Sequence, residues 1–153
     1  MRLKRTLGIA AVAVAAVAAG LAPAGAHSIK KNGIEVVHPW TRETDQPATE
    51  VYFKIKNAGA KAERLVGASS PDAEKVELRQ PSASDKDATT ALDAVTVPAK
   101  GESELTSSTV RLVVTGLKKK LDAYGRMPLT LQFERAGKMA VEVMVEEAAE
   151  SAH

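Results

Sequence analysis

Alternation of apolar and polar residues recurs along this chain, and this period of two constrains its fold more than any other feature. In residues 51–56 the odd positions are apolar and two of the three even positions are lysine. Successive side chains of a β-strand point to opposite faces of a sheet, so such a segment buries one face and exposes the other. The same pattern predicts strands at residues 110–114, 129–134 and 139–145, with shorter candidates at 34–37, 64–68, 75–78 and 94–97.

Short segments rich in Gly, Pro, Asn or Asp separate these strands, as expected for turns. They occupy residues 57–59, 70–72, 98–101 and 136–138, and the last of them predicts a hairpin. Strands that follow one another at intervals of roughly ten residues, each with one apolar face, favour two antiparallel sheets packed face to face. We therefore predict an all-β fold, a single β-sandwich.

The first 26 residues have the composition of a secretory signal peptide. Arg2, Lys4 and Arg5 precede an unbroken apolar run at residues 7–21, and small residues at positions 24 and 26 fit a cleavage site. A retained anchor helix is the alternative, but the run is shorter than the roughly 20 residues that a membrane span needs. We expect cleavage after Ala26 and no membrane span in the mature chain.

Removal of the signal peptide leaves an almost neutral chain without thiols. Residues 1–26 hold three of the 21 basic residues and none of the 19 acidic ones. A nucleic-acid binder would need a basic face, and nothing in the sequence supplies one. The absence of cysteine excludes disulfides, thiolate metal sites, a lipid-bearing cysteine and cysteine catalysis. We divide the mature chain into an N-terminal arm (27–33), a β-domain (34–146) and a flexible acidic tail (147–153).

Five segments, in order along the chain, resemble the periplasmic copper chaperones of the PCu(A)C family. They are HPWTR at 38–42, VYFKIKNAG at 51–59, ERLVGASSPDAEKVEL at 63–78, GLKKKL at 116–121 and MPLTLQFERAGKMAVEVMV at 127–145. The resemblance implies a cupredoxin-like Greek-key β-sandwich in the bacterial periplasm. It also implies copper binding in the assembly of the Cu(A) centre of cytochrome c oxidase. The implied partner is a copper-receiving membrane oxidase subunit or another periplasmic copper carrier.

The chain departs from the family's pattern at the copper ligands. The family's first His corresponds to Arg79, and its Met to a position near Thr89 or Thr90. Its His-x-Met pair corresponds to Arg111 and Val113, which strand alternation should leave exposed. Copper(I) prefers thioether and imidazole donors, whereas arginine stays protonated and offers no lone pair. We expect this inherited site to be degenerate.

Three histidines remain as donors, at positions 27, 38 and 153. Cleavage after Ala26 would give His27 a free α-amine, which can chelate one metal ion together with the imidazole of the same residue. Copper(II) can displace the protons of both groups at neutral pH, and ligation by two nitrogens suits copper(II) better than copper(I). His38 or His153 would supply a second imidazole if the fold brings it close. We name His27 and His38 as the candidate metal ligands.

Other interpretations of these residues stay open. His27 is otherwise the start of a flexible terminus without metal. His38 precedes Pro39, which predicts an extended backbone, and is otherwise a structural or solvent-facing residue. Because side chains alternate between the two faces of a strand, Met139 is expected in the core and Met144 on the outward face. Met127 is expected in a loop. None of the three is predicted as a ligand.

Two functions compete. The first is a periplasmic, chaperone-like copper-binding protein that uses altered ligands at its N-terminus. The second is a metal-free β-sandwich module that recognises a partner protein or an anion through Arg79 and Arg111. Each of these arginines could instead pair with a nearby carboxylate on the sheet. We do not expect an enzyme, because a Ser-His-Asp arrangement would have to use His38 and the chain has no nucleophile elbow.

Overall fold

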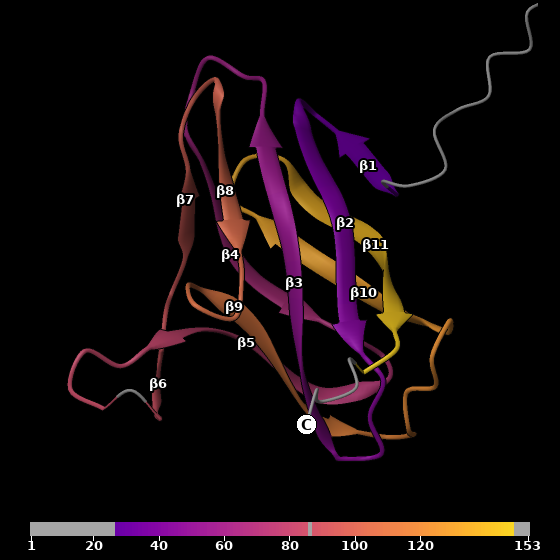
Figure 1. The fold of residues 1–153 in the computed structure, drawn as a ribbon. Coiled ribbons are helices and arrows are strands. Elements are labelled where there is room, and N and C mark those ends of the chain that lie inside the picture. Colours follow the sequence, from indigo (N-terminus) through magenta and orange to yellow (C-terminus); the bar gives the residue numbers. More distant parts are fainter. Residues whose placement is uncertain (1–26, 86, 149–153) are drawn as a thin grey trace, which may run out of the picture.

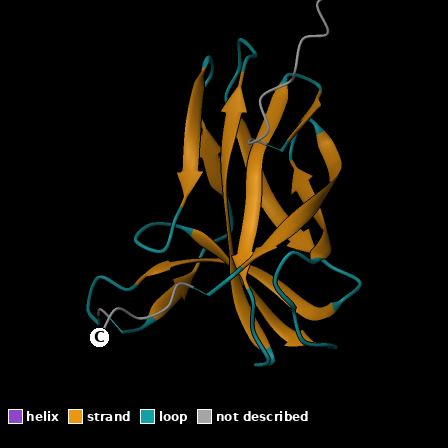
Figure 2. Ribbon diagram, turned by 45° about the vertical axis from the view of Figure 1, so that its right-hand side comes forward, coloured by secondary structure: helices purple, strands orange, loops and turns teal. Residues whose placement is uncertain are grey.

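The structure, a computed structural model, describes residues 27–85 and 87–148. Over these residues the chain forms strands and loops and no helix that could span a membrane (Figure 2). In chain order the strands are β1 (Ser28–Lys31), β2 (Ile34–Arg42), β3 (Ala48–Asn57), β4 (Glu63–Ser69), β5 (Ala73–Pro81), β6 (Thr89–Ala91), β7 (Val95–Val97), β8 (Gly101–Leu105), β9 (Arg111–Leu117), β10 (Arg126–Phe133) and β11 (Gly137–Glu146). The all-β prediction is confirmed. The predicted signal peptide and His153 lie outside the described residues.

The strands follow one continuous, curled path in the order β6-β5-β9-β3-β2-β11-β10-β4-β7, with β1 added beside β2 and β8 beside β3 (Figure 1). Strand β3 joins the two layers, because residues 48–51 pair with β9 while residues 53–57 pair with β8. The pairing is antiparallel except between β2 and β11, which run parallel. Periodicity predicts which face of a strand is buried, and this parallel contact between strands distant in sequence is not encoded in it.

The apolar faces of the strands meet in one core. Residues 51, 53 and 55 are buried and Lys54 and Lys56 are not, as the alternation predicts. The apolar residues of the other long alternating segments are buried as well. They are Leu112, Val114, Leu129, Leu131, Phe133, Met139, Val141, Val143 and Val145. Burial of apolar area at roughly 25 cal/mol per Å² stabilises this fold without any disulfide.

One local prediction needs correction here. Met127 was expected in a loop, but it lies in β10 and is fully buried. The neighbouring Pro128 is tolerated in the strand because β10 pairs there with β11 alone, and its pairing with β4 begins at Thr130. The stretch predicted as an N-terminal arm contains β1, which pairs antiparallel with β2.

Candidate functional site

The two candidate ligands, His27 and His38, line the same surface pocket. Its volume is about 300 Å³, and it lies among β1, β2, β11 and the loop before β10. Figure 1 shows β1, β2 and β11 side by side. The complete lining is His27, His38, Tyr124, Met144, Val145, Glu146 and Glu147.

The pairing of β1 with β2 brings the two histidines together. Ser28 lies opposite Val37 in the antiparallel register. One step further along both strands, the backbone N–H of His38 donates to the carbonyl oxygen of His27 at 2.7 Å. The backbone therefore fixes His27 against His38 at the point where the described chain begins.

His38 has a left-handed backbone conformation, with φ of 48°. The prediction of an extended residue before Pro39 is therefore wrong. A register shift between Val37 and Trp40 in the β2–β3 pairing shows that β2 bulges at this point. A non-glycine residue in this conformation costs on the order of 1 kcal/mol or more, and such residues are concentrated at functional sites.

Glu146 contacts the imidazole of His38 from the neighbouring strand. The distance between His38 Nε2 and Glu146 Oε1 is 2.8 Å. A carboxylate only accepts hydrogen bonds, so Nε2 carries the proton and donates it. In a neutral imidazole this leaves the lone pair on Nδ1 free for a metal ion, the arrangement in which a carboxylate orients a ligating histidine.

Met144 completes the set of donors on the pocket wall. It is half-buried in β11, and its backbone lies opposite Trp40 in the parallel register. Nowhere in the described part of the chain do three or more His, Asp or Glu side chains gather as a metal site. A metal in this pocket would therefore need a donor of another kind, such as the α-amine of His27 or the thioether of Met144.

Sequence reasoning found the histidines of this pocket but missed Met144 and Glu146. The alternation along the strand placed both side chains on the outward face of β11. In the structure both are half-buried, whereas Val143 and Val145 are buried. The sequence did not show which strand lies beside them. The parallel contact of β11 with β2 joins residues more than a hundred positions apart, and no local pattern encodes it.

The inherited positions also converge, in another part of the sheet. Arg79 in β5 lies directly opposite Arg111 in β9. Thr89, from β6, accepts hydrogen bonds from Arg79, from Nε to Oγ1 at 2.7 Å and from Nη2 to its carbonyl oxygen at 2.8 Å. Val113 faces Glu77 on one side and Glu50 on the other. The family pattern thus locates a real cluster, although its side chains include no imidazole or thioether.

Each arginine of this cluster contacts a carboxylate. Arg79 Nη1 lies 3.5 Å from Glu77 Oε2, and Arg111 Nε lies 2.8 Å from Glu50 Oε1, although its N–H does not point at that oxygen. Arg111 also donates to the carbonyl oxygen of Ser107. The Arg111 side chain is only 14% exposed, so the prediction that it faces solvent is wrong: β3 and β5 flank it on both sides. Of the two alternatives for these arginines, the structure shows the one in which each pairs with a nearby carboxylate.

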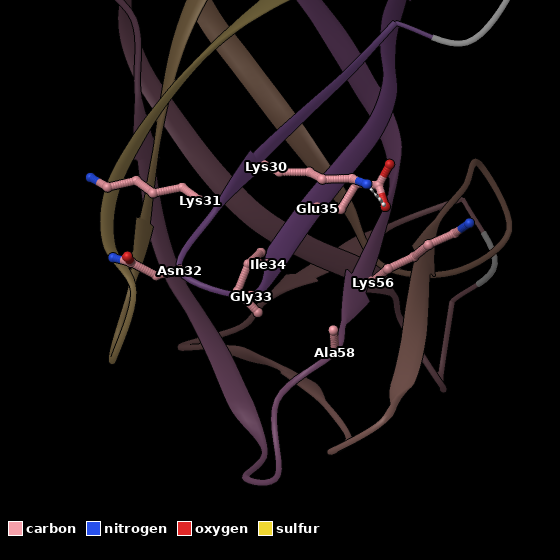
Figure 3. Close-up of a pocket in the computed structure, with 8 residues that line it drawn as sticks. All are labelled: Lys30, Lys31, Asn32, Gly33, Ile34, Glu35, Lys56 and Ala58. Carbon is pink, nitrogen blue, oxygen red and sulfur yellow. Dashed lines mark ion pairs between the residues drawn. The ribbon is translucent and has the colours of Figure 1, made fainter.

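A further pocket, of about 270 Å³, lies where the turn between β1 and β2 approaches the end of β3 (Figure 3). Lys30 points at Glu35, with 3.9 Å between Nζ and Oε2. Lys31 and Lys56 extend away from each other on opposite sides. These lysines do not converge on a common point, so the pocket has no built anion site.

Comparisons with known proteins agree with this architecture. The chain is similar to the copper-bound PCuAC domain from PmoF2, at 22% identity and a TM-score of 0.69 over 80% of this chain and 99% of that one. The apo PCuAC domain from PmoF1 matches at 21% identity and a TM-score of 0.70, over 80% and 100% of the two chains. CuI-DR1885 from Deinococcus radiodurans matches at 21% identity and a TM-score of 0.62, over 84% and 87%.

Identities at this level establish the fold, so the predicted PCu(A)C-type fold is confirmed. No curated protein sequence matches the chain. The family model of the LpqE-like lipoproteins matches residues 34–145, which is most of the described chain. The match includes His38, Met144, Arg79 and Arg111. The chain belongs to the LpqE-like family.

Proposed function

We propose that this protein is a periplasmic copper carrier that binds copper(II) through the α-amine and imidazole of His27 and the imidazole of His38. The observation that carries the proposal is the shared pocket, in which the backbones of the two histidines are hydrogen-bonded at 2.7 Å. Three nitrogen donors from two residues suit copper(II). Export followed by cleavage after Ala26 would create the free amine.

The donor set of the inherited cluster does not fit copper. Two guanidinium groups, a hydroxyl and an isopropyl group offer no soft lone pair. A bare guanidinium about 6 Å away would repel a monovalent ion by roughly 3 kcal/mol at an effective dielectric constant of 20. Glu50 and Glu77 offset that repulsion here. The lack of donors, rather than positive charge, therefore makes the inherited site degenerate.

The pocket suits a cargo better than a resident cofactor. His38 and Glu146 both keep about two fifths of their side-chain surface exposed, so another protein could reach the metal. We propose a carrier rather than an enzyme. It would hand copper to a membrane oxidase subunit during assembly of the Cu(A) centre, or to another periplasmic copper carrier.

The alternative, a metal-free module that binds an anion through Arg79 and Arg111, is less well supported. The two arginines are adjacent, as that function requires. However, both already contact carboxylates, and Arg79 also donates twice to Thr89. An incoming anion would have to displace these partners, and the charges of the cluster nearly cancel without it.

Copper(II) titration of three matched proteins tests the proposal. The first is residues 27–153, which contain every described strand, and the second carries one added alanine before His27, which removes the free amine of that histidine. The third is His38→Asn, because asparagine tolerates a left-handed backbone better than alanine does. We expect tight binding by the first and a loss of at least about tenfold, or 1.4 kcal/mol, in each of the others.

Arg79→Gln is the control, because it alters the inherited cluster and leaves the pocket intact. We expect it to bind copper(II) like the unmodified protein. Equal binding with and without the added alanine would contradict the proposal. An absence of copper binding by all of the proteins would favour the metal-free alternative.

A further inference from the structure

Met144 carries a thioether in the pocket that the proposed copper(II) binding does not use. Its side chain lines the pocket together with both histidines, and it is half-buried rather than part of the core. The other methionines of the described chain, Met127 and Met139, are buried among apolar residues. Met144 is therefore the described thioether that a metal in the pocket can approach.

The position of Glu146 shows on which side of β11 this thioether lies. Residues two apart in a strand project from the same face. Glu146 contacts the imidazole of His38 at 2.8 Å, so its face of β11 is the one turned toward His38. Met144 lies on that same face, one pleat earlier. Its three rotatable side-chain bonds allow the sulfur to adjust toward a bound ion.

The chemistry of a thioether differs from that of the nitrogen donors. It is neutral and soft, and soft donors favour copper(I) over copper(II). The amine and the two imidazoles suit copper(II), and the imidazoles together with a thioether suit copper(I). The same pocket therefore presents a donor set for each oxidation state.

We propose that Met144 is a copper ligand that serves copper(I), so that this single pocket holds copper in both oxidation states. His27 and His38 bind the ion in either state, and the sulfur of Met144 joins them when the ion is monovalent. This inference rests on the proposed function and extends it to the form of copper that the carrier can accept or release.

Met144→Leu tests the inference, because leucine has a similar volume and no sulfur. Copper(I) affinity is measured without oxygen, by competition with bicinchoninate in a reducing buffer. Copper(II) affinity is measured by competition with glycine, with electron paramagnetic resonance reporting the nitrogen donors. We expect Met144→Leu to weaken copper(I) binding by at least about tenfold, or 1.4 kcal/mol. We expect it to leave copper(II) binding unchanged.

Met139→Leu is the matched control, because this methionine lies in the same strand with its side chain in the core. It should change neither affinity. X-ray absorption of the copper(I) form should show a sulfur neighbour in the unmodified protein and in Met139→Leu, and none in Met144→Leu.

The results distinguish a failure of this inference from a failure of the proposed function. Unchanged copper(I) affinity in Met144→Leu, or an equal loss for both oxidation states, overturns the role of Met144 and leaves the copper(II) site standing. Insensitivity of copper(II) binding to the added alanine overturns the proposed function itself. Circular dichroism of each variant confirms that it is folded before it is titrated.

Discussion

His38 combines an unfavourable backbone conformation with three local contacts. Its N–H donates to His27, its imidazole contacts Glu146, and buried Pro39 follows it in β2. These contacts fix the residue at φ of 48° and hold the ring in place. A ligand that is already oriented loses less conformational entropy when the metal arrives, which raises the affinity.

Glu146 is expected to act through His38. Replacing it with alanine removes the acceptor for Nε2–H and should lower copper(II) affinity about 10–100-fold, as other outer partners of ligating histidines do. Glu146→Gln keeps an acceptor oxygen and should lose less. Isothermal titration at several pH values measures both variants.

Glu147→Ala is the control for that measurement, since Glu147 lines the same pocket beside Tyr124 rather than His38. It should bind copper(II) normally. Tighter binding in Glu146→Ala would show that the carboxylate competes with the metal for His38 instead of orienting it.

Tyr52 is in β3, which lies between the strands of the pocket and those of the inherited cluster. Its ring is 5.0 Å from that of Trp40, which stacks beneath the guanidinium of Arg42 at 5.5 Å. The Tyr52 hydroxyl donates to Glu50, which also contacts Arg111. Burial, and then the hydrogen bond to Glu50, raise the pKa of Tyr52 from 10.0 to about 12.

This raised pKa predicts a loss of stability in alkaline solution. Above pH 10 the unfolded chain releases the phenol proton while the folded chain keeps it. The free energy of unfolding should therefore fall from pH 10 until the folded pKa near 12 is reached. Absorbance titration of Tyr124→Phe, which leaves Tyr52 as the sole tyrosine, measures that pKa.

Glu50→Gln in the same background removes the charge that disfavours the phenolate. Its titration midpoint should be lower than that of Tyr124→Phe alone. A midpoint at the ordinary value in Tyr124→Phe itself would contradict the burial and hydrogen bonding assigned to Tyr52.

At the scale of elements, the clearest sequence signals predicted the longest strands. The alternating residues 51–56 lie in β3 as predicted, and residues 129–133 of the predicted strand 129–134 lie in β10. Strands β1 and β8 were missed because they are short and mostly polar, with a single apolar residue each at Ile29 and Leu105. Their strand conformation comes from pairing with β2 and β3, which a local pattern does not contain.

The same limit explains which parts of the candidate site could be predicted. The chemistry of His27 and His38 can be read from residue type, and the resemblance located the cluster of Arg79 and Arg111. Met144 was assigned the correct face but no partner. Its place beside His38 depends on the β2–β11 contact, and a long-range pairing is fixed by the whole fold rather than by residues nearby.

Glu63 ties β4 to the hairpin of β10 and β11. Its carboxylate is buried and accepts backbone N–H groups of Arg64, Arg135 and Ala136 at 2.9–3.0 Å. Glu63→Ala should lower the free energy of unfolding by about 3 kcal/mol, because it leaves buried donors without an acceptor. Urea denaturation followed by circular dichroism measures the change.

Glu134→Ala is the matched control in the same hairpin. Glu134 forms an exposed ion pair with Arg64 at 3.2 Å, so its loss should cost less than about 1 kcal/mol. Similar losses in the two variants would contradict the structural role given to Glu63.

At the scale of the whole molecule, the candidate pocket and the inherited cluster occupy separate regions of the described chain. The inherited cluster lies on β5, β6 and β9, and the pocket lies on β1, β2 and β11 (Figure 1). Strands β3 and β2 connect them across the sheet. In the proposed function the fold keeps the geometry of the family's copper site in the first region, while the side chains there form a network of paired charges.

That retained geometry predicts that copper(I) binding can be restored. Arg79→His, Thr89→Met, Arg111→His and Val113→Met together would place two imidazoles and two thioethers on adjacent strands. In a background with the added alanine before His27 and Met144→Leu, which weakens the pocket, the four changes should raise the copper(I) affinity above that of the background. Competition with bicinchoninate measures it.

Val113→Met alone in that background is the control and should bind weakly, because one thioether makes a poor site. If the fourfold variant does no better, the alignment of these positions with the family's ligands is wrong. Both results should be read together with a thermal melt, since the substitutions also remove two ion pairs.

The parallel contact between β2 and β11 pairs a strand near the beginning of the described chain with the strand near its end, so the complete pocket needs both. A growing polypeptide that has not yet been extended through residue 146 has His27 and His38 but lacks the strand that supplies Met144 and Glu146. In the proposed function such a chain could still bind copper through the two histidines, but without the contact of Glu146 and the thioether of Met144, so full affinity should appear only once β11 is in place.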